Sequence, residues 1–303
     1  MDKIPPVQAL WIAVLVTGVY PVAGKFAAGV ISPSLLLLCS TAAAVLFWAP
    51  WVSKNKMWGV FFRRDTFLPF CIIGLMGTAL PFLLIFIALQ YTTPANAAIL
   101  NQTEAVYSLL LAAIFLRERP SAKQLLGTAL VISGVAVILL GGKFSPRWKG
   151  DIIVLCTVWM FQVSHIFAKK LPKDLPPQLL STGRAIFAFI WSLPIAFILA
   201  SFNFDISAFR PGWTLALLLL YMGVVNYAVG NAFWYKAIRN MDLSKATAVI
   251  LCYPVITYLL SALAGTDKFA AGRTAGLALA LSGAYLITIT IKKGKTKNET
   301  GSV

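Results

Sequence analysis

Long apolar runs recur along the whole chain, and they constrain the fold more than any other feature of the sequence. A helix that crosses a bilayer needs about 20 mostly apolar residues. Such runs occupy residues 7–28, 33–52, 67–91, 94–116, 121–141, 149–171, 175–202, 212–238, 242–264 and 270–291. Hydrophobic residues make up 59% of the chain and charged residues 12%, far from the averages of soluble domains. The sequence therefore predicts an all-α integral membrane protein with ten transmembrane helices.

The positions of the positive charges indicate how these helices are oriented. With the N-terminus inside, 18 Lys and Arg residues fall in inner segments and 7 in outer segments. Cytoplasmic loops carry the excess of Lys and Arg in membrane proteins. We therefore expect a multi-pass protein of the cytoplasmic (inner) membrane, with both termini cytoplasmic. The net charge of +16 then reflects contact with the lipid bilayer and its surfaces, and no nucleic-acid partner is expected.

The two halves of the chain repeat one pattern. An offset of 149 residues aligns Gly74 with Gly223 and Ala97 with Ala246 without a gap, and an offset of 144 aligns Pro33 with Pro177. A duplicated unit of five helices inserts its second copy upside down, because five is an odd number. We therefore expect inverted repeats at residues 7–141 and 149–292, followed by a cytoplasmic tail at 293–303. Inverted repeats are typical of carriers that expose a central site to each side in turn.

Sequence motifs in both halves resemble a known transporter segment. The first half contains IALQYTTPANAAILNQTEAVYSLLLAAIFLRERPSAKQLLGTALVISGVAVIL, and the second contains FWYKAIRNMDLSKATAVILCYPVITYLLSALAG and GRTAGLALALSGAYL. Both resemble the EamA-type repeat of the drug/metabolite transporter superfamily, over nearly the whole chain. The resemblance implies a central cavity lined by helices one, three, four, six, eight and nine, with helices five and ten outside.

The resemblance also implies a function. We expect a secondary transporter that moves a small organic metabolite, an amino acid or a related compound, out of the cell by alternating access. Protons or a counter-substrate are candidate coupling partners. A carrier of sugar nucleotides or lipid-linked sugars in the same superfamily is the alternative, followed by an intramembrane enzyme or a channel. The sequence has no HExxH, GxSxG or Walker motif and no His/Cys metal set, so we predict no catalytic, cofactor or metal residues.

The fourth run contains an unusual acidic residue. Glu104 lies about ten residues inside this run, roughly 15 Å deep at 1.5 Å per residue. A carboxylate facing lipid there would cost on the order of 3 kcal/mol, so Glu104 must face a cavity, find a partner or stay protonated. Asn101 shares its helix stripe, together with Ala97 and Ser108. Tyr253 is the counterpart of Glu104 in the second half, and we expect the two to approach a central site from opposite repeats. The alternative is that Glu104 fixes helix packing through hydrogen bonds.

Other polar residues in the predicted helices are candidates for substrate contact. They are Gln162 and His165 on one stripe of the sixth run, and Asn226, Asn231 and Trp234 in the eighth. Each has a structural alternative in interhelical hydrogen bonding or packing, which we favour for His165. We interpret Arg184 as a structural lock, and Lys25 as a side chain that extends to the membrane surface. The small residues Gly272, Gly276 and Ala280 allow close helix approach, either within the chain or in a homodimer.

Overall fold

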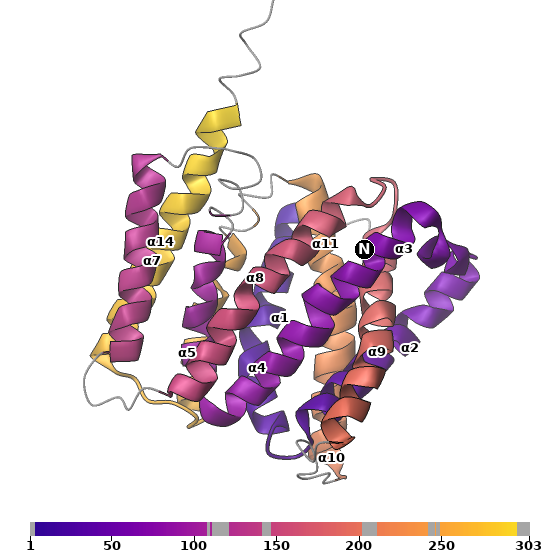
Figure 1. The fold of residues 1–303 in the computed structure, drawn as a ribbon, viewed down its shortest axis with the longest axis horizontal. Helices are drawn as coiled ribbons and strands as arrows, with labels where there is room; N and C mark the ends of the chain where they lie inside the picture. Colours follow the sequence, from indigo (N-terminus) through magenta and orange to yellow (C-terminus); the bar gives the residue numbers. More distant parts are fainter. Residues whose placement is uncertain are drawn as a thin grey trace, which may run out of the picture.

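The computed structural model describes residues 4–107, 110, 121–140, 147–201, 211–241, 246 and 249–295, and the regular elements in these ranges are all helical. The first half contains α1 (Pro6–Ala27), α2 (Pro33–Lys54), η1 (Trp58–Phe62), α3 (Arg64–Gly74), η2 (Leu75–Ala79), α4 (Leu80–Tyr91), α5 (Pro94–Leu100), η3 (Asn101–Thr103) and α7 (Ala122–Leu140). The second half contains α8 (Trp148–Lys170), α9 (Pro177–Ser201), α10 (Trp213–Leu219), η4 (Leu220–Gly230), α11 (Asn231–Asn240), α13 (Tyr253–Leu263) and α14 (Ala271–Lys295). Figure 1 shows the helices packed as one bundle.

Six helices in the described part of the chain are long and apolar enough to cross a membrane. They span Pro6–Ala27, Pro33–Lys54, Arg64–Tyr91, Trp148–Ala168, Pro177–Leu199 and Trp213–Asn240. Two shorter apolar helices cover Ala122–Val137 and Tyr253–Leu263. The multi-pass helical membrane architecture is thus confirmed, whereas the count of ten crossings stays a prediction. Residues 296–303, most of the expected tail, lie outside the described ranges.

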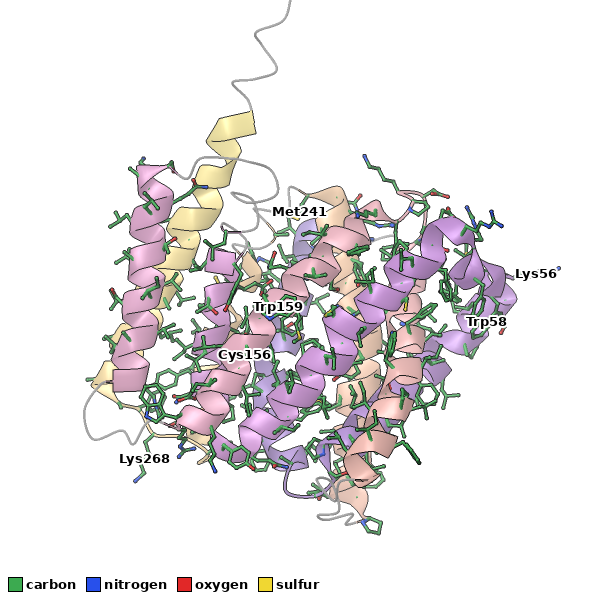
Figure 2. All side chains as sticks on the ribbon, viewed as in Figure 1. Lys56, Trp58, Cys156, Trp159, Met241 and Lys268 are labelled. Carbon is green, nitrogen blue, oxygen red and sulfur yellow. The ribbon has the colours of Figure 1, made fainter. Side chains whose placement is uncertain are left out.

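Large apolar side chains cover the outside of the bundle, as Figure 2 shows. The exposed fraction is 39% for Trp159, 71% for Leu46 and 83% for Leu263. Many polar side chains are buried instead, among them Ser40, Thr78 and Gln102. This distribution suits a protein whose surface faces hydrocarbon, because lipid does not penalise exposed apolar groups.

The third predicted helix of each half contains a π-helical segment. In the first half, η2 interrupts the continuous helix formed by α3 and α4; in the second half, η4 lies between α10 and α11. The repeat offset of 149 residues places Leu75–Ala79 onto residues 224–228, inside η4. π-Helical turns are rare and occur mostly at functional sites. The two halves therefore share a backbone irregularity as well as a sequence pattern.

The fourth predicted helix of each half is broken at one matching position. After α5, residues Asn101–Thr103 form the 3-10 turn η3, and the α-helix resumes at Glu104. In the second half, residues 251–252 form a turn and α13 begins at Tyr253. The same offset of 149 residues superposes these breaks. Helices interrupted in this way are typical of transporter binding sites.

Helices α7 and α14, the last of each half, pack side by side (Figure 1). A Cβ atom on Gly134 would lie 2.6 Å from the carbonyl oxygen of Gly276 and 2.8 Å from the backbone nitrogen of Ala280. Two of the three small residues noted in the sequence therefore serve contacts within the chain. A Cβ atom on Gly272 would meet nothing within 4 Å. The homodimer stays an untested expectation.

We predict that Gly134→Ala destabilises the protein by about 1–3 kcal/mol, because the added methyl group overpacks the α7–α14 contact. The free energy of unfolding in detergent micelles would measure this effect. Gly272→Ala, made on the facing helix where there is open space, is the matched control and should not lower stability, because alanine favours the helix without a clash. Equal stability of both variants would contradict the close approach of the two helices.

Candidate functional site

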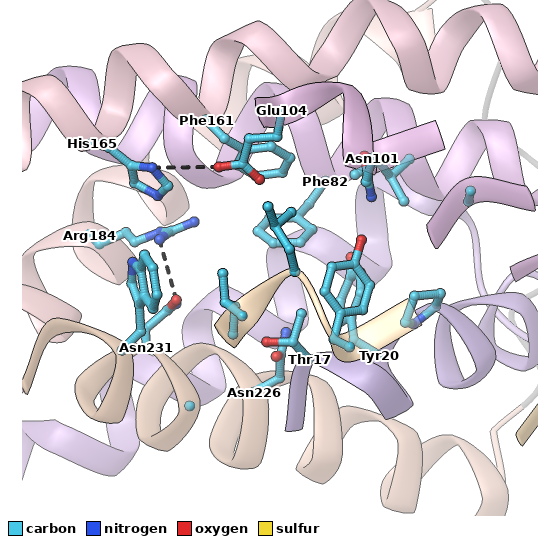
Figure 3. A pocket seen from close by; sticks show the side chains of 18 residues that line it. Thr17, Tyr20, Phe82, Asn101, Glu104, Phe161, His165, Arg184, Asn226 and Asn231 are labelled. Carbon is cyan, nitrogen blue, oxygen red and sulfur yellow. Dashed lines mark hydrogen bonds and ion pairs between the residues drawn. The ribbon is translucent and has the colours of Figure 1, made fainter. Parts of the chain in front are cut away.

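A cavity of about 140 Å³ lies between the two halves, and its lining includes residues of both helix breaks and of the π-helical segment η4. Figure 3 shows the side chains that converge on it from both repeats. Its described lining residues are Thr17, Tyr20, Pro21, Phe82, Ile85, Ala97, Asn101, Glu104, Phe161, His165, Arg184, Asn226, Gly230, Asn231, Trp234, Ile250, Leu251 and Tyr253. Aromatic and aliphatic side chains predominate, with a few polar groups among them, which is typical of sites for small organic ligands.

The structure brings most of the predicted site residues together. Seven of the eight candidates line the cavity: Asn101, Glu104, His165, Asn226, Asn231, Trp234 and Tyr253. The eighth, Gln162, is not a lining residue but donates a hydrogen bond to Glu104. Ala97 of the predicted stripe also lines the cavity, and Ser108 lies outside the described residues. Whether these residues bind a substrate stays a prediction.

Glu104 faces the cavity and also has protein partners. Its Oε1 atom accepts a hydrogen bond of 2.6 Å from Nε2 of Gln162 and lies 3.7 Å from Nδ1 of His165. The carboxylate side chain is 18% exposed. The centroid of the His165 ring lies 5.7 Å from that of Trp234. Because Gln162 and His165 lie on α8, this cluster also joins the fourth helix of the first half to the first helix of the second.

Arg184 is the residue that sequence reasoning left out of the cavity. Its guanidinium group donates to Oγ1 of Thr78 at 2.6 Å, to the carbonyl oxygen of Gly77, and to Oδ1 of Asn231 at 3.3 Å. Gly77 and Thr78 belong to η2, so one π-helical turn supplies two of these acceptors. In the described part of the chain, no carboxylate forms an ion pair with Arg184. The hydrogen bonds agree with the predicted lock, but the side chain also borders the cavity (Figure 3).

One sequence signal could have identified Arg184. It lies about nine residues into the apolar run 175–202, and the repeat aligns it with Ser40, so the two halves differ in charge at this position. An arginine at that depth needs a partner or a polar cavity. The sequence does not reveal that helix seven borders the cavity in addition to the six helices implied by the resemblance.

An aromatic wall closes one side of the cavity. The ring centroid of Tyr20 lies 4.9 Å from that of Phe82 and 6.4 Å from that of Tyr227. On the opposite repeat, the hydroxyl group of Tyr253 donates to the carbonyl oxygen of Ala98 over 3.5 Å. Tyr253 therefore contacts α5, which lies just before the turn that precedes Glu104.

A polar network joins α1, α4 and α8 at the end of the bundle that is predicted to be extracellular. Lys25 donates to the carbonyl oxygens of Leu89 and Thr92, which lie at the C-terminal end of α4 and just beyond it. The hydroxyl group of Thr92 donates to Oδ1 of Asp151, whose side chain is buried. The interpretation of Lys25 as a side chain extending to the membrane surface is therefore wrong. Its ammonium group instead satisfies carbonyl groups that the end of a helix leaves without partners.

These features define a class: a multi-pass membrane protein in which two like halves enclose a mostly apolar cavity with a few polar groups. Residues 6–140 and 148–289 each match the model of the EamA-like transporter family. The chain belongs to that family, and the resemblance found in its sequence is confirmed. The family and the names of its relatives indicate a transporter and not an enzyme.

Several curated proteins are similar to the chain over most of its length. An "Uncharacterized transporter" of Archaeoglobus fulgidus is 25% identical over 84% of both chains. A "Probable amino-acid metabolite efflux pump" of Escherichia coli K12 is 28% identical over 70% of this chain and 74% of its own. A "Probable terminal-alkyne amino-acid exporter" of Streptantibioticus cattleyicolor is 27% identical over 55% of this chain and 54% of its own.

A solved crystal structure has the same fold. It superposes with a TM-score of 0.67 over 94% of this chain and 98% of its own, at 17% identity. This likeness concerns the arrangement of the helices alone.

We predict that Thr78→Val destabilises the protein by about 1–3 kcal/mol, because it leaves a charged N–H donor of Arg184 without its acceptor. Thr128→Val is the matched control, since the Thr128 hydroxyl donates only within its own helix, to the carbonyl oxygen of Gln124 at 2.9 Å. Unfolding of both variants in the same detergent gives the comparison. Equal losses would show that the Arg184–Thr78 bond adds nothing to stability.

Proposed function

We propose that this protein is a secondary transporter that exports a small organic metabolite, an amino acid or a related compound, across the cytoplasmic membrane by alternating access. The observation that supports this most directly is the cavity bordered by the matched helix breaks of both repeats. Two relatives named as an amino-acid metabolite efflux pump and an amino-acid exporter support the substrate class.

The charges that line the cavity also bear on the alternative function, a carrier of sugar nucleotides. Sugar nucleotides carry two or more negative charges and need several cations in a site of low dielectric. Arg184 is the one permanent cation among the described lining residues, and Glu104 opposes it with a carboxyl group. An uncharged or zwitterionic metabolite therefore fits the balance of charge better than a sugar nucleotide.

Alternating access requires that contacts between the repeats form and break at each end of the bundle. At the predicted outer end, α8 of the second repeat closely approaches α4 of the first. A Cβ atom on Gly150 would lie 2.7 Å from the carbonyl oxygen of Ala88 and 2.8 Å from Cβ of Thr92. The hydrogen bond from Thr92 to Asp151 joins the same two helices. We infer that this contact closes the cavity to the outside and separates when the transporter opens outward.

Gly150→Val should hold the outer ends of α8 and α4 apart, because its side chain cannot fit against the backbone of α4. We expect faster labelling of a cysteine introduced as Ala97→Cys by a membrane-impermeant reagent added from outside. Gly29→Ala is the matched control near the same end, since its Cβ atom would meet only ordinary contact at 3.5 Å. Unchanged labelling in Gly150→Val would refute an outer closure at this place.

Glu104→Gln should lower the rate of counterflow in reconstituted vesicles about tenfold or more and change its dependence on pH. The substitution keeps the shape of the side chain but removes a charge, and one charged hydrogen bond contributes about 1.5–3 kcal/mol. Asp65→Asn is the control, because Asp65 forms an exposed ion pair with Arg63 at 2.9 Å, far from the cavity lining. If Glu104→Gln transports at the wild-type rate and with the wild-type pH dependence, Glu104 has only a packing role. A vesicle uptake screen against labelled metabolite pools, with and without a pH gradient, would identify the substrate.

A further inference from the structure

The cavity holds two groups of opposite charge that do not neutralise each other. Glu104 and Arg184 both line it, and within the described part of the chain the carboxylate and the guanidinium group form no ion pair with one another. Each is held by neutral or titratable partners instead: Glu104 by Gln162 and His165, and Arg184 by Thr78, Gly77 and Asn231. Opposite charges kept apart in a site of low dielectric favour a ligand that bears both complementary charges.

Hydrogen-bonding capacity remains on both charged groups. A guanidinium group has five N–H donors, and Arg184 uses three of them in the bonds described above. The partners of Glu104 approach its Oε1 atom, and no described residue donates a hydrogen bond to Oε2. Figure 3 shows both side chains directed toward the cavity. Asn101, on the same helix stripe as Glu104, also has a side-chain oxygen without a hydrogen-bond donor among the described residues.

The apolar lining and the volume of the cavity indicate the size and polarity of the rest of the ligand. Tyr20, Phe82, Phe161 and Ile250 add apolar surface to the same cavity. The cavity volume of about 140 Å³ lies below the roughly 300–1,000 Å³ of sites for drug-sized ligands. It therefore suits one compact molecule with a short apolar part.

We propose that the cavity binds the zwitterion of an α-amino acid with an apolar side chain, with its carboxylate on Arg184 and its ammonium group on Glu104. This inference rests on the proposed transport function and assigns a chemical class to its substrate. Arg184 pairs with the carboxylate through its two remaining N–H donors, in the planar geometry that guanidinium groups provide. Glu104 and Asn101 supply oxygen acceptors for the ammonium group.

The test measures binding to purified protein in lipid nanodiscs and, separately, counterflow in vesicles. Two ligand sets serve as probes: L-leucine with 3-methylbutylamine and 4-methylpentanoate, and L-phenylalanine with 2-phenylethylamine and 3-phenylpropionate. Each amine lacks the carboxylate of the amino acid, and each acid lacks its ammonium group. We expect the wild-type protein to bind at least one of the two amino acids about tenfold or more tightly than both analogues, because each analogue loses one charged hydrogen-bonding pair.

Substitutions then test which residue binds the carboxylate of the ligand and which binds its ammonium group. Arg184→Gln should bind the amino acid and its amine about equally, and Glu104→Gln should bind the amino acid and its acid about equally. Arg63→Gln and Asp65→Asn change the same residue types in an exposed pair and should keep the wild-type preference. Arg184→Lys retains the charge but not the planar donor pair, so it should recover part of the preference. The comparison of ligands on the wild-type protein needs no variant and stands even if Arg184→Gln fails to fold.

The outcomes separate this inference from the proposed function. If the wild-type protein binds an amine or an acid as tightly as the amino acid, or transports another class of metabolite and binds neither amino acid, the zwitterion site is wrong and the transport function stands. If an amino acid binds with the expected preference but no labelled metabolite shows counterflow, the site stands and the transport function is wrong.

Discussion

The burial of two opposite charges within an apolar bundle is the constraint on which the rest of this structure depends. Neither Glu104 nor Arg184 tolerates a low-dielectric environment without polar partners. Glu104 obtains them from α8, and Arg184 obtains them from η2 and Asn231. The carbonyl oxygen of Gly77 that accepts from Arg184 lies in the π-helical turn η2. Irregular segments thus adjoin both charged groups: η2 supplies two acceptors to Arg184, and η3 directly precedes Glu104.

The two repeats share their backbone irregularities but differ in their polar side chains. Both third helices have a π-helical segment, and both fourth helices break at the position preceding Glu104 or Tyr253. Yet a carboxyl group in the first repeat corresponds to a phenol in the second, and Arg184 corresponds to Ser40. Paired irregularities of this kind are typical of transporters built from internal repeats. The unlike side chains place different polar groups on the parts of the cavity that the two repeats contribute.

Helices α7 and α14 are built for a different role. Their glycines allow backbone contact, and no residue of either helix lines the cavity in the described part of the chain. Close packing of small residues gives a tight interface between transmembrane helices, because it increases van der Waals contact where no hydrophobic force acts. The helices around the cavity also approach closely at glycines, such as Gly18 of α1 against Ile256 of α13, and polar contacts join them in addition, such as the hydrogen bond from Thr257 to the carbonyl oxygen of Gly18, at 2.7 Å. What distinguishes α7 and α14 is therefore their place away from the cavity, not the closeness of their packing.

The sequence alone determined the membrane class, the duplication and the helix stripe that contains Asn101 and Glu104, because insertion energy and helical periodicity depend on local sequence. It also identified most of the polar residues around the cavity, because few polar residues lie deep in the apolar runs. Only the tertiary structure decided that Arg184 borders the cavity, that Gln162 lies behind Glu104, and that Lys25 binds the end of α4. Each of these depends on partners far away in the chain: Arg184 and Thr78 are 106 positions apart, and Gln162 and Glu104 are 58 apart. Hydropathy gives the depth of a residue in the membrane, but the rotation and packing of whole helices decide which neighbour it meets.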